Sequence, residues 1–478
     1  MKERVYLTTT LPYVNADPHI GFALETVHAD IFARYNRLVG REVFFNTGTD
    51  EHGQKIFDKA KEEGKDPQKY VDEYAARFDK LRSALNLSYD NFIRTTDPKH
   101  VKAAQEFWKR CKENGDIYKK LYKVKYCVGC ELEKTDSELV DGKCELHPNK
   151  ELEIREEENY FFRFSKYQKK LLELYKKDPH FVIPGHRLNE IKAFVERGLE
   201  DFSISRLKEK MSWGVPVPDD PDHVMYVWFD ALVNYVSAIG WPDKAYEKWW
   251  PVIQFAGKDN LRQQSAMWQA MLLSAGIAPS KQIVIHGFIN SGGKKMSKSL
   301  GNVVDPFKLV EGYGTDAVRY YLVRHVHPFE DSDYTDARFE EAYTANLVNG
   351  LGNQVSRILK LSEMYLDQPA TIDPKDLLYS DEFVGYIEAF EFQKATDLIW
   401  EHIGKVDEYI QKTEPFKKIQ SEDDKEKQEA HEAIQKLVGH IALIAYYLEP
   451  LMPETSEKIK KAIQANKKPD APLFPRKQ

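Results

Sequence analysis

Two short motifs in the chain suit phosphate chemistry. His19-Ile20-Gly21-Phe22 stands at the expected start of a helix, where free backbone N–H groups and the helix dipole favour anionic phosphates. Lys295-Met296-Ser297-Lys298-Ser299 follows Ser291-Gly292-Gly293, whose glycines allow a lysine-bearing loop to move. Either motif alone is also typical of an ordinary helix start or a basic surface loop. The chemistry they suit is binding of a triphosphate and stabilisation of a pyrophosphate leaving group.

Three of the four cysteines lie close together in a third motif. Cys127-Val128-Gly129-Cys130 and Cys144-Glu145-Leu146-His147 supply four ligands of the kind that Zn²⁺ prefers in a closed tetrahedral site. Buried free cysteines beside a surface histidine are the alternative, which the ligand spacing disfavours. We therefore predict one structural zinc ion per chain, bound by Cys127, Cys130, Cys144 and His147.

The elements that must position the phosphate motifs are predicted to alternate between strands and helices. Residues 5–9 read as a strand, apolar residues at spacings of three and four predict a helix from Ile20 to Leu38, and residues 42–46 read as the next strand. This is half of a doubly wound nucleotide-binding fold. Further strands are predicted at 224–229, 252–256 and 283–286, at intervals that fit parallel crossovers.

Two regions do not follow this alternation of strands and helices. Residues 116–225 contain the cysteine motif and are predicted to be an insertion between the two halves of the α/β domain. After residue 335 no strand is expected, and the apolar face of residues 434–448 predicts a helix that ends before Pro450. The charged residues 412–427 are predicted to form a solvated loop within this α-helical tail.

The order and context of the two phosphate motifs resemble the paired signatures of class I aminoacyl-tRNA synthetases. The surrounding stretches are similar to methionyl-tRNA synthetases of the single-zinc-knuckle type, nearly from end to end. The insertion is too short for the editing domain of the leucine, isoleucine and valine enzymes. The stretches that carry this resemblance are Leu11-Pro12-Tyr13-Val14-Asn15, Thr47-Gly48-Thr49-Asp50-Glu51-His52-Gly53, Arg197-Gly198-Leu199-Glu200-Asp201, Tyr226-Val227-Trp228-Phe229-Asp230-Ala231, Gly257-Lys258-Asp259 and Pro472-Leu473-Phe474-Pro475.

The resemblance implies a fold and an activity. The expected fold is a Rossmann-like catalytic domain in two halves, 1–115 and 226–300, with the zinc-knuckle insertion at 116–225. Residues 301–345 would contact the tRNA stem beside the lysine loop, and residues 346–478 would form the α-helical anticodon-binding domain. The implied reaction activates L-methionine with ATP and Mg²⁺ to methionyl-adenylate, releases pyrophosphate, and transfers methionine to the 3′ end of tRNA(Met), initiator tRNA included.

The resemblance also implies a role for individual positions. Asp50 would bind the ammonium group of methionine, and His19, Gly21, Lys295 and Lys298 would be catalytic. The ATP site would comprise Pro12, His19, Gly21, Phe22, Glu25, Gly257, Lys258, Asp259, Lys295, Ser297 and Lys298. The methionine site would comprise Leu11, Tyr13, Asp50, Trp228, Ala231, Leu232, Tyr235, Asn260 and Gln264. Asn346 and Phe416 would contact the anticodon, with Phe416 offering a flat surface for base stacking.

Several positions depart from the family pattern. Phe22 stands where the helix-start signature ends in histidine, and Leu232 replaces a frequent proline. Asn260 and Gln264 occupy positions that are commonly isoleucine and histidine, and Phe416 replaces tryptophan. A buried amide needs hydrogen-bond partners, so we expect Gln264 to bond Tyr235 or ordered water. These departures concern affinity and leave the reaction class unchanged.

Composition limits the remaining choices. The chain has 478 residues, enough for roughly three domains. Its formal net charge of −7 gives no general support for nucleic-acid binding, so RNA must meet local basic surfaces. The mean hydropathy of −0.58 and the absence of a signal-like apolar run predict a cytoplasmic protein without membrane contact. Because no dimerising module is expected after the helical tail, we predict a monomer.

Three alternatives remain at this point. A synthetase for another aliphatic amino acid would differ in ATP–pyrophosphate exchange with methionine, leucine, isoleucine and valine. A nucleotidyltransferase acting on a small molecule would need neither the helical tail nor the zinc insertion. A zinc-stabilised RNA-binding protein with a degenerate catalytic site would bind RNA without exchange activity, and only Phe22 favours it.

Overall fold

A parallel sheet forms the centre of the catalytic half. The computed structural model describes residues 3–127, 132–134, 139–144, 149, 151–296 and 301–477. Its six-stranded sheet has the order β3-β2-β1-β13-β14-β9 and is parallel throughout. The strands are β1 (Arg4–Thr9), β2 (Glu42–Thr49), β3 (Asn91–Arg94), β9 (Val182–Ile183), β13 (Ile253–Gly257) and β14 (Gln282–His286). Order reverses between β1 and β13, where ligands of such sheets bind beyond the carboxyl ends.

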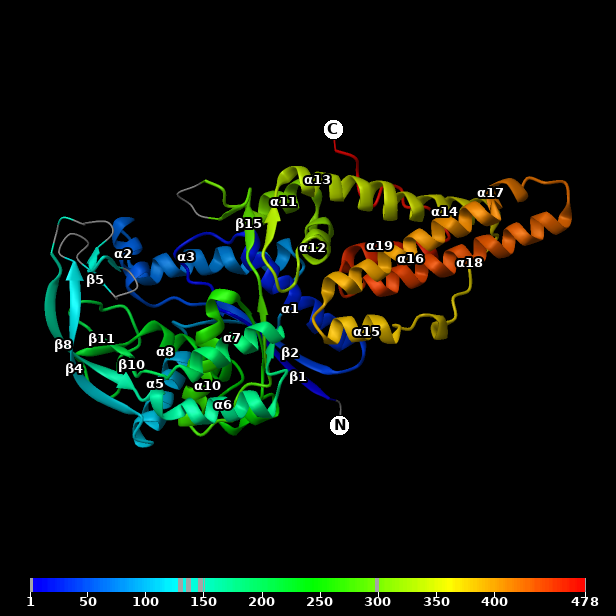
Figure 1. The fold of residues 1–478 in the computed structure, drawn as a ribbon. Helices are drawn as coiled ribbons and strands as arrows, with labels where there is room; N and C mark the ends of the chain where they lie inside the picture. The colour runs from blue at the N-terminus through cyan, green and yellow to red at the C-terminus, as the bar shows by residue number, and fades with distance from the viewer. Residues whose placement is uncertain are drawn as a thin grey trace.

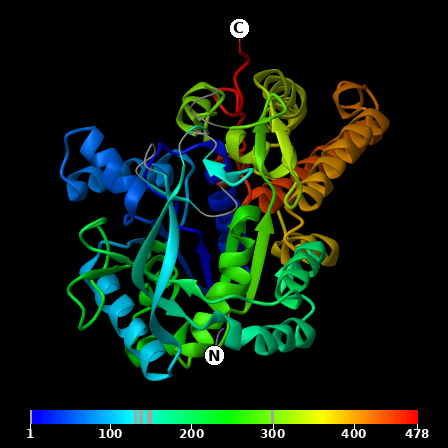
Figure 2. The same cartoon turned by 60° about the vertical axis from the view of Figure 1, so that its left-hand side comes forward.

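Helices surround this sheet (Figures 1 and 2). The first, α1 (Ile20–Leu38), joins β1 to β2 and is buried on nearly all sides, which explains its many apolar and small residues. The other helices of the catalytic half and its insertion are α2 (Gln54–Glu62), α3 (Pro67–Asp79), α4 (Leu81–Ala84), α5 (Pro98–Glu113), α6 (Gln168–Lys177), α7 (Gly185–Glu196), α8 (Val227–Ala231), α9 (Asn234–Ser237) and α10 (Trp268–Ser274).

A second, antiparallel sheet projects from the catalytic half. Its order is β10-β8-β4-β5, and it is dominated by the long pair β4 (Ile117–Cys127) and β8 (Glu153–Phe162). Its smaller strands are β5 (Leu132–Lys134) and β10 (Phe202–Ser203). Two separate two-stranded sheets are formed by β6 (Leu139–Val140) with β7 (Lys143–Cys144), and by β11 (Ser205–Leu207) with β12 (His223–Met225). One segment of the predicted insertion behaves differently, because β9 joins the central sheet beside β14.

The C-terminal part is a helical bundle that extends away from the sheets (Figure 1). Its elements are α11 (Pro306–Tyr313), α12 (Thr315–Arg324), α13 (Asp336–Ala342), the π-helical η7 (Tyr343–Gly352), α14 (Asn353–Tyr365), α15 (Asp381–Glu388), α16 (Phe392–Thr413), α17 (Pro415–Lys418), α18 (Asp424–Leu448) and α19 (Pro453–Gln464). Three short strands, β15 (Ile289–Ser291), β16 (Lys294–Lys295) and β17 (Ser332–Tyr334), form a small sheet at the base of the bundle, with β17 following α12 in the sequence.

Catalytic half and bundle share one apolar core. Leu24 of α1, Leu322 of α12 and Leu437 of α18 belong to the same buried cluster. At its centre Arg319 is fully buried and donates to Asp30 Oδ2 at 2.8 Å. The same guanidinium donates to the carbonyl oxygens of Leu85, Pro450 and Leu451 at 3.0, 3.1 and 2.8 Å. A buried charge satisfied from three parts of the chain fixes the bundle against α1.

The expected fold class is confirmed, with local errors besides the position of β9. The predicted strand 224–229 is not part of the parallel sheet: β12 ends at Met225 and pairs antiparallel with β11, and α8 follows. Short apolar runs do not distinguish a buried strand from a buried helix. Residues 412–427 are not a continuous loop: α16 extends to Thr413, and Pro415 occupies the first turn of α17, where its fixed φ suits a helix start. No helix within the described ranges is both long and apolar enough to cross a membrane.

Candidate active site

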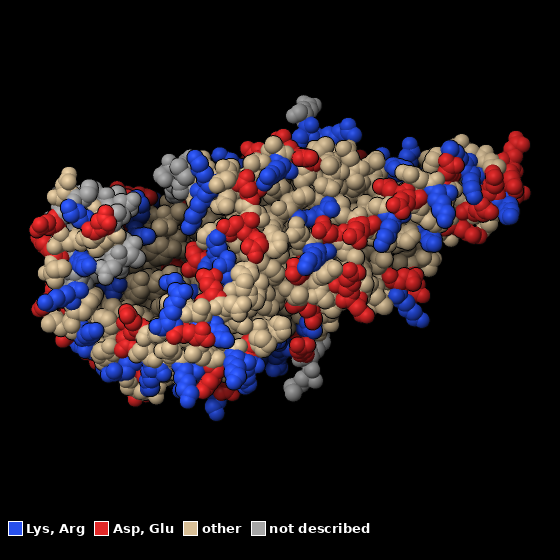
Figure 3. Space-filling model, in the orientation of Figure 1, with Lys and Arg blue, Asp and Glu red and all other residues tan. Residues whose placement is uncertain are grey.

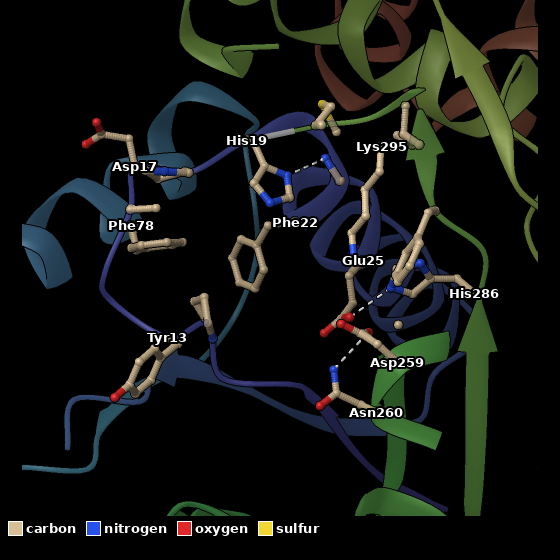
Figure 4. Close-up of a pocket in the computed structure, with 18 of the residues that line it drawn as sticks. Tyr13, Asp17, His19, Phe22, Glu25, Phe78, Asp259, Asn260, His286 and Lys295 are labelled. Atoms are coloured by element: carbon tan, nitrogen blue, oxygen red, sulfur yellow. Dashed lines mark hydrogen bonds and ion pairs between the residues drawn. The ribbon is translucent and has the colours of Figure 1, made fainter. Parts of the chain in front are cut away.

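A cavity of about 290 Å³ opens where α1 begins and where β13 and β14 end. Figure 3 shows the molecule deeply hollowed beside its centre, and Figure 4 shows the cavity from within. The position agrees with the rule that open α/β sheets bind ligands at the carboxyl ends of their strands. The predicted site residues that line the cavity are Pro12, Tyr13, His19, Gly21, Phe22, Glu25, Gly257, Asp259, Asn260 and Lys295.

His19 caps the helix that meets this cavity. Its Nδ1 accepts the backbone N–H of Gly21 at 3.1 Å, so the neutral ring carries its hydrogen on Nε2. Burial lowers the pKa of His19, although Asp259 opposes the shift, and the neutral ring is therefore favoured. A Cβ on Gly21 would approach the His19 ring to 3.0 Å. A glycine therefore suits position 21, because a side chain there would crowd the His19 ring. The His19 ring in turn keeps its Nε2–H available to donate to a ligand.

Phe22 contributes to an aromatic wall on one side of the cavity. Its ring meets Phe78 of α3 edge to face, with centroids 5.4 Å apart. Tyr13 lines the same side, and Figure 4 shows these aromatic residues opposite Glu25, Asp259 and His286. Such edge-to-face pairs stabilise both rings. Phe22 is therefore held by packing and leaves no polar group without a partner.

A buried ion pair stands opposite this wall. Glu25 Oε1 accepts both the backbone N–H and the hydroxyl of Thr10 at 2.6 Å, while its Oε2 lies 2.8 Å from His286 Nε2. His286 Nδ1 lies 2.7 Å from the carbonyl oxygen of Gly287. Burial alone would lower the pKa of His286, but Glu25 raises it, which favours the imidazolium. Sequence reasoning missed His286, although a histidine ending a parallel strand stands where such sites form.

The lysines predicted for ATP binding are placed differently. Lys295 lines the cavity, with Nζ 4.7 Å from the centroid of the Phe288 ring. Lys258 is not among the lining residues; its Nζ pairs with Asp331 Oδ2 at 2.6 Å and lies 4.6 Å from the same ring. Ser297 and Lys298 lie outside the described residues. A single described lysine therefore faces the cavity.

Gln264 makes the hydrogen bond expected of it. Its Nε2 donates to the Tyr235 hydroxyl at 2.8 Å, and its Oε1 accepts from Gln254 Nε2 at 2.8 Å. The side chain is 1% exposed, so it does not face solvent. Their spacing of four predicts that Asn260 and Gln264 share one face of an α-helix, but they do not. Asn260 ends the 3₁₀ turn η4 (Lys258–Asn260) and lines the cavity, whereas Gln264 lies in the π-helical η5 (Gln263–Met267) and turns into the core.

The other residues predicted to contact methionine surround the ends of β1 and α8. Leu11 and Trp228 are half-buried, so part of each remains accessible, while Ala231 and Tyr235 are almost fully buried. Leu232 packs within the buried core behind α8. None of these five residues lines the cavity of Figure 4. They could contact only a group that reaches beyond this cavity, behind Tyr13.

Asp50 is fixed by the loop that carries Leu11 and Tyr13. Its backbone N–H donates to the carbonyl oxygen of Pro12 at 3.0 Å, and its own carbonyl oxygen accepts from the Val14 N–H at 3.2 Å. The side chain is buried, and within the described residues Oδ1 has no hydrogen-bond partner. Burial and then the nearby Asp230 raise the pKa of Asp50. An unsatisfied buried carboxylate of this kind suits a ligand cation.

Comparison with known proteins decides the family. Residues 5–150 and 130–359 match the family described as "tRNA synthetases class I (M)", and residues 378–473 match the "Anticodon binding domain of methionyl tRNA ligase". The chain belongs to the methionyl-tRNA synthetase family. It is 41% identical to the methionine–tRNA ligase of Thermotoga maritima, covering 98% of this chain and 76% of that protein. The enzyme of Thermosynechococcus vestitus is 42% identical, with 96% and 90% covered.

A solved structure of this family supports the same fold. The Mycobacterium tuberculosis methionyl-tRNA synthetase in complex with methionyl-adenylate superposes with a TM-score of 0.89 at 35% identity. The match covers 99% of this chain and 100% of that one. The two-part architecture seen here, a class I catalytic half followed by a helical bundle, is therefore that of methionyl-tRNA synthetases.

The zinc ligands predicted from this family are described only in part. Cys144 is buried in β7, which pairs with β6. Cys127 ends β4, but its side chain lies outside the described part, as do Cys130 and His147 altogether. Among the described residues no cluster of three or more His, Cys, Asp or Glu side chains is arranged for a metal ion. The donor chemistry of the four residues still fits zinc.

The two residues matched to anticodon contacts lie on different elements. Asn346 lies in η7, where its Oδ1 accepts from Arg324 of α12 at 3.2 Å and its Nδ2 donates to the Ala342 carbonyl oxygen at 3.2 Å. Phe416 lies in α17 and is 41% exposed. Figure 1 places α17 at the outer end of the bundle and α12 near its base. The structure thus gives Phe416 an open ring, whereas the amide of Asn346 is engaged within the protein.

Proposed function

We propose that this chain uses the cavity at the start of α1 to activate methionine with ATP and then charges tRNA(Met). As a methionine–tRNA ligase it forms methionyl-adenylate and pyrophosphate, and the terminal adenosine of the tRNA then attacks the adenylate. Two groups carry the proposal: His19, which caps α1 in the cavity with one N–H left to donate, and the buried carboxylate of Asp50, whose backbone N–H bonds the cavity residue Pro12. One suits a phosphate oxygen and the other an ammonium group.

ATP binding uses the wall that contains His19, Gly21 and Glu25. The His19 Nε2–H donates to an α-phosphate oxygen, and the α1 N-terminus stabilises the negative charge. Gly257 and Asp259 receive the ribose, since Asp259 lines the cavity with a polar group. Asn260, which we assign to the methionine site, lines the same cavity. Lys295, with Ser297 and Lys298 of the lysine loop, stabilises the departing pyrophosphate. ATP binds as its complex with Mg²⁺, and the metal ion neutralises part of the phosphate charge.

Methionine is oriented by charge at one end and by an aromatic pocket at the other. Asp50 pairs with the ammonium group, which directs the carboxylate toward the α-phosphorus. Leu11, Tyr13, Trp228, Ala231 and Tyr235 receive the side chain. Because the Tyr235 hydroxyl accepts from Gln264, its own hydrogen remains to be donated to the weakly accepting sulfur. Leu232 supports this pocket from the core.

The bundle binds the anticodon, with Phe416 as a stacking surface and Asn346 as a polar contact. Exposure of the Phe416 ring supports its part. For Asn346, binding requires the amide to exchange its bond with Arg324 for one with a base. The proposed division of the chain is catalytic at 1–115 and 226–300, insertion at 116–225, stem contact at 301–345 and anticodon binding at 346–478. We further propose a cytoplasmic monomer, which sedimentation of the intact chain would test.

One structural zinc ion is proposed for Cys127, Cys130, Cys144 and His147. When bound, it would cross-link the Cys127 and Cys130 pair to Cys144 and His147 in an insertion too small to be held by its own core. Metal analysis of protein purified without added zinc should find one zinc per chain. Cys144→Ala should lose the metal and loosen the insertion, while the helical content of the bundle is retained in circular dichroism. A fully folded, active, metal-free enzyme would contradict the proposal.

ATP–pyrophosphate exchange is the decisive assay for the activity. Exchange should depend on methionine and should be far weaker with leucine, isoleucine or valine. Charging of tRNA(Met) should follow. Exchange that prefers another aliphatic amino acid would overturn the methionine assignment, and exchange without charging would favour a small-molecule nucleotidyltransferase. RNA binding without any exchange would indicate a degenerate site.

A further inference from the structure

The proposed ammonium-binding residue, Asp50, has a second buried carboxylate, Asp230, in the same part of the protein. Asp50 follows β2 and Asp230 lies in α8; they are 6% and 0% exposed. In the described part of the chain, Oδ1 of each lacks a hydrogen-bond partner, and neither carboxylate pairs with a lysine or arginine. His52, two residues after Asp50, has its Nδ1 3.0 Å from Asp230 Oδ2, so the two carboxylates belong to one buried polar site. Two such groups cannot both ionise without strong repulsion unless a cation joins them.

The adjacent residue, Glu51, is a buried carboxylate whose charge is balanced within the protein. Glu51 is also fully buried, but Arg94 donates to both of its oxygens at 2.7 and 2.9 Å. The Thr49 hydroxyl donates to it as well at 2.6 Å. Glu51 is therefore neutralised within the protein. Asp50, one residue earlier, is left without a basic partner, which points to a cation that arrives with the ligand.

Two imidazoles bias the pair so that Asp230 keeps its charge. His52 Nδ1 lies 3.0 Å from Asp230 Oδ2. His100 bonds Ser237 Oγ through Nδ1 at 2.9 Å and turns Nε2 toward Asp230 Oδ1 at 3.8 Å. Burial alone would raise the pKa of Asp230, but these histidines lower it.

The remaining neighbours make Asp50 the weaker acid of the two. Burial and Asp230 raise its pKa, and the charge of Glu51 adds to that effect, while the backbone N–H groups of His52 and Glu51 oppose it. Tyr13 faces Asp50 from the loop after β1, and its own pKa is raised by burial and by Asp50. Tyr13 is thus uncharged near neutral pH and supplies no cation. A proton shared within the pair would therefore reside on Asp50.

We propose that the Asp50–Asp230 pair holds one proton while the amino-acid site is empty and releases it to solvent when the α-ammonium of the substrate binds Asp50. This inference rests on the proposed function. Asp230 acts through Asp50 and is a positioning residue. The ammonium replaces the proton as the cation that Asp50 holds, so charge balance within the buried site is kept.

The exchange of proton for ammonium has a definite pH signature. Below the pKa of Asp50 in the empty enzyme, binding must displace the proton, so affinity for methionine rises with pH. Where a full proton is displaced, the apparent Kd falls about tenfold per pH unit. Above that pKa, Asp50 is already ionised and the dependence disappears. Lowering the pH therefore weakens methionine binding before it disturbs the phosphate contacts.

Calorimetry of the intact enzyme measures the released proton directly. Methionine is titrated in pairs of buffers with different ionisation enthalpies, from about pH 5.5 to about pH 8. Proton release should approach one at the acid end and decline as the pH rises. Methioninol, which keeps the ammonium but lacks the carboxylate, should release the same proton from the wild-type protein. Binding of methionine without proton release across this range would overturn the inference.

Two variants distinguish the effect of Asp230 on proton release from the effect of removing any carboxylate. Asp230→Asn should shift proton release to lower pH, because Asp50 then ionises without its neighbour's repulsion. Asp397→Asn, which alters a half-exposed carboxylate paired with Arg324 in the bundle, should leave the proton count unchanged. Equal proton release by Asp230→Asn and wild type would refute the role of Asp230. Loss of methionine-dependent exchange in the wild type would instead refute the proposed function, so the two failures are distinguishable.

Discussion

The proposed nucleotide side and the proposed amino-acid side of the site accommodate unusual residues in different ways. On the nucleotide side, Phe22 stands where the family pattern has histidine and packs edge to face on Phe78 and against the apolar core. On the amino-acid side, Gln264 replaces another histidine and is bonded on both ends of its amide, to Tyr235 and Gln254. Gln254 in turn accepts from Ser280.

The difference follows from solvent access and polarity. An apolar ring at the wall of an open cavity leaves no group unsatisfied, so it can change alone. An amide inside the core must find partners for both its donor and its acceptor, because each unmet group costs about 1–3 kcal/mol. Substitutions on the buried side therefore depend on their neighbours, whereas those on the open side are nearly independent.

The largest effect is expected from the polar residue of the open side. His19→Ala removes the one N–H that the helix cap directs at the phosphates and should slow adenylate formation by about 10²-fold or more. Phe22→Ala, its neighbour on the same turn, should have a far smaller effect. Pre-steady-state adenylate formation measures both. Equal losses would show that Phe22 takes part in phosphate binding and that the two sides do not differ as described.

On the buried side, Gln264→Ala should raise the KM for methionine more than it lowers kcat, since the phosphate chemistry is untouched. The loss should correspond to about 1–3 kcal/mol, because Tyr235 and Gln254 each lose a partner. Exchange kinetics with varied methionine measure the split. Tyr235→Phe combined with Gln264→Ala should cost less than the sum of the two single changes. An unchanged KM would remove Gln264 from the methionine pocket.

The comparison extends to Phe416, which packs on no other aromatic ring among the described residues and has Lys417 Nζ 5.9 Å from its ring centroid. Phe416 is exposed at 41%, unlike Phe22, so its ring is available to a base. Phe416→Ala should weaken tRNA charging by about 1–3 kcal/mol and leave exchange without tRNA unaffected. Equal losses in both assays would mean that Phe416 supports the fold.

The smallest effect is expected at Asn346, the proposed polar contact to the anticodon. Asn346→Ala should lower kcat/KM for tRNA modestly, because the amide must first leave Arg324. Asn353→Ala is the matched comparison, since Asn353 is exposed on α14 in the same helical run. If only Asn353→Ala impairs charging, the polar contact belongs to the exposed asparagine and the assignment to Asn346 is wrong.

Sequence reasoning succeeded where a pattern has one physical cause. The period of α1 and the strand–turn–helix around His19 were predictable because burial and capping act locally. The Gln264–Tyr235 bond was predictable from the needs of a buried amide. The π-helical turn at Gln263–Met267 was not, because π-turns leave no regular spacing in the sequence. The pairing of His286 with Glu25, 261 positions apart, depends on two strands and a helix meeting, which no local pattern encodes.

The four-way bonding of Arg319 also sets an order of events during synthesis. Asp30 leaves the ribosome 289 residues before Arg319, and Leu451 follows Arg319 by 132 residues. Until that last segment emerges, the guanidinium has Asp30 and Leu85 but lacks its two C-terminal carbonyl partners. A charge with only part of its partners resists burial. The final packing of α1 against α12 therefore requires the later segment that contains Pro450 and Leu451.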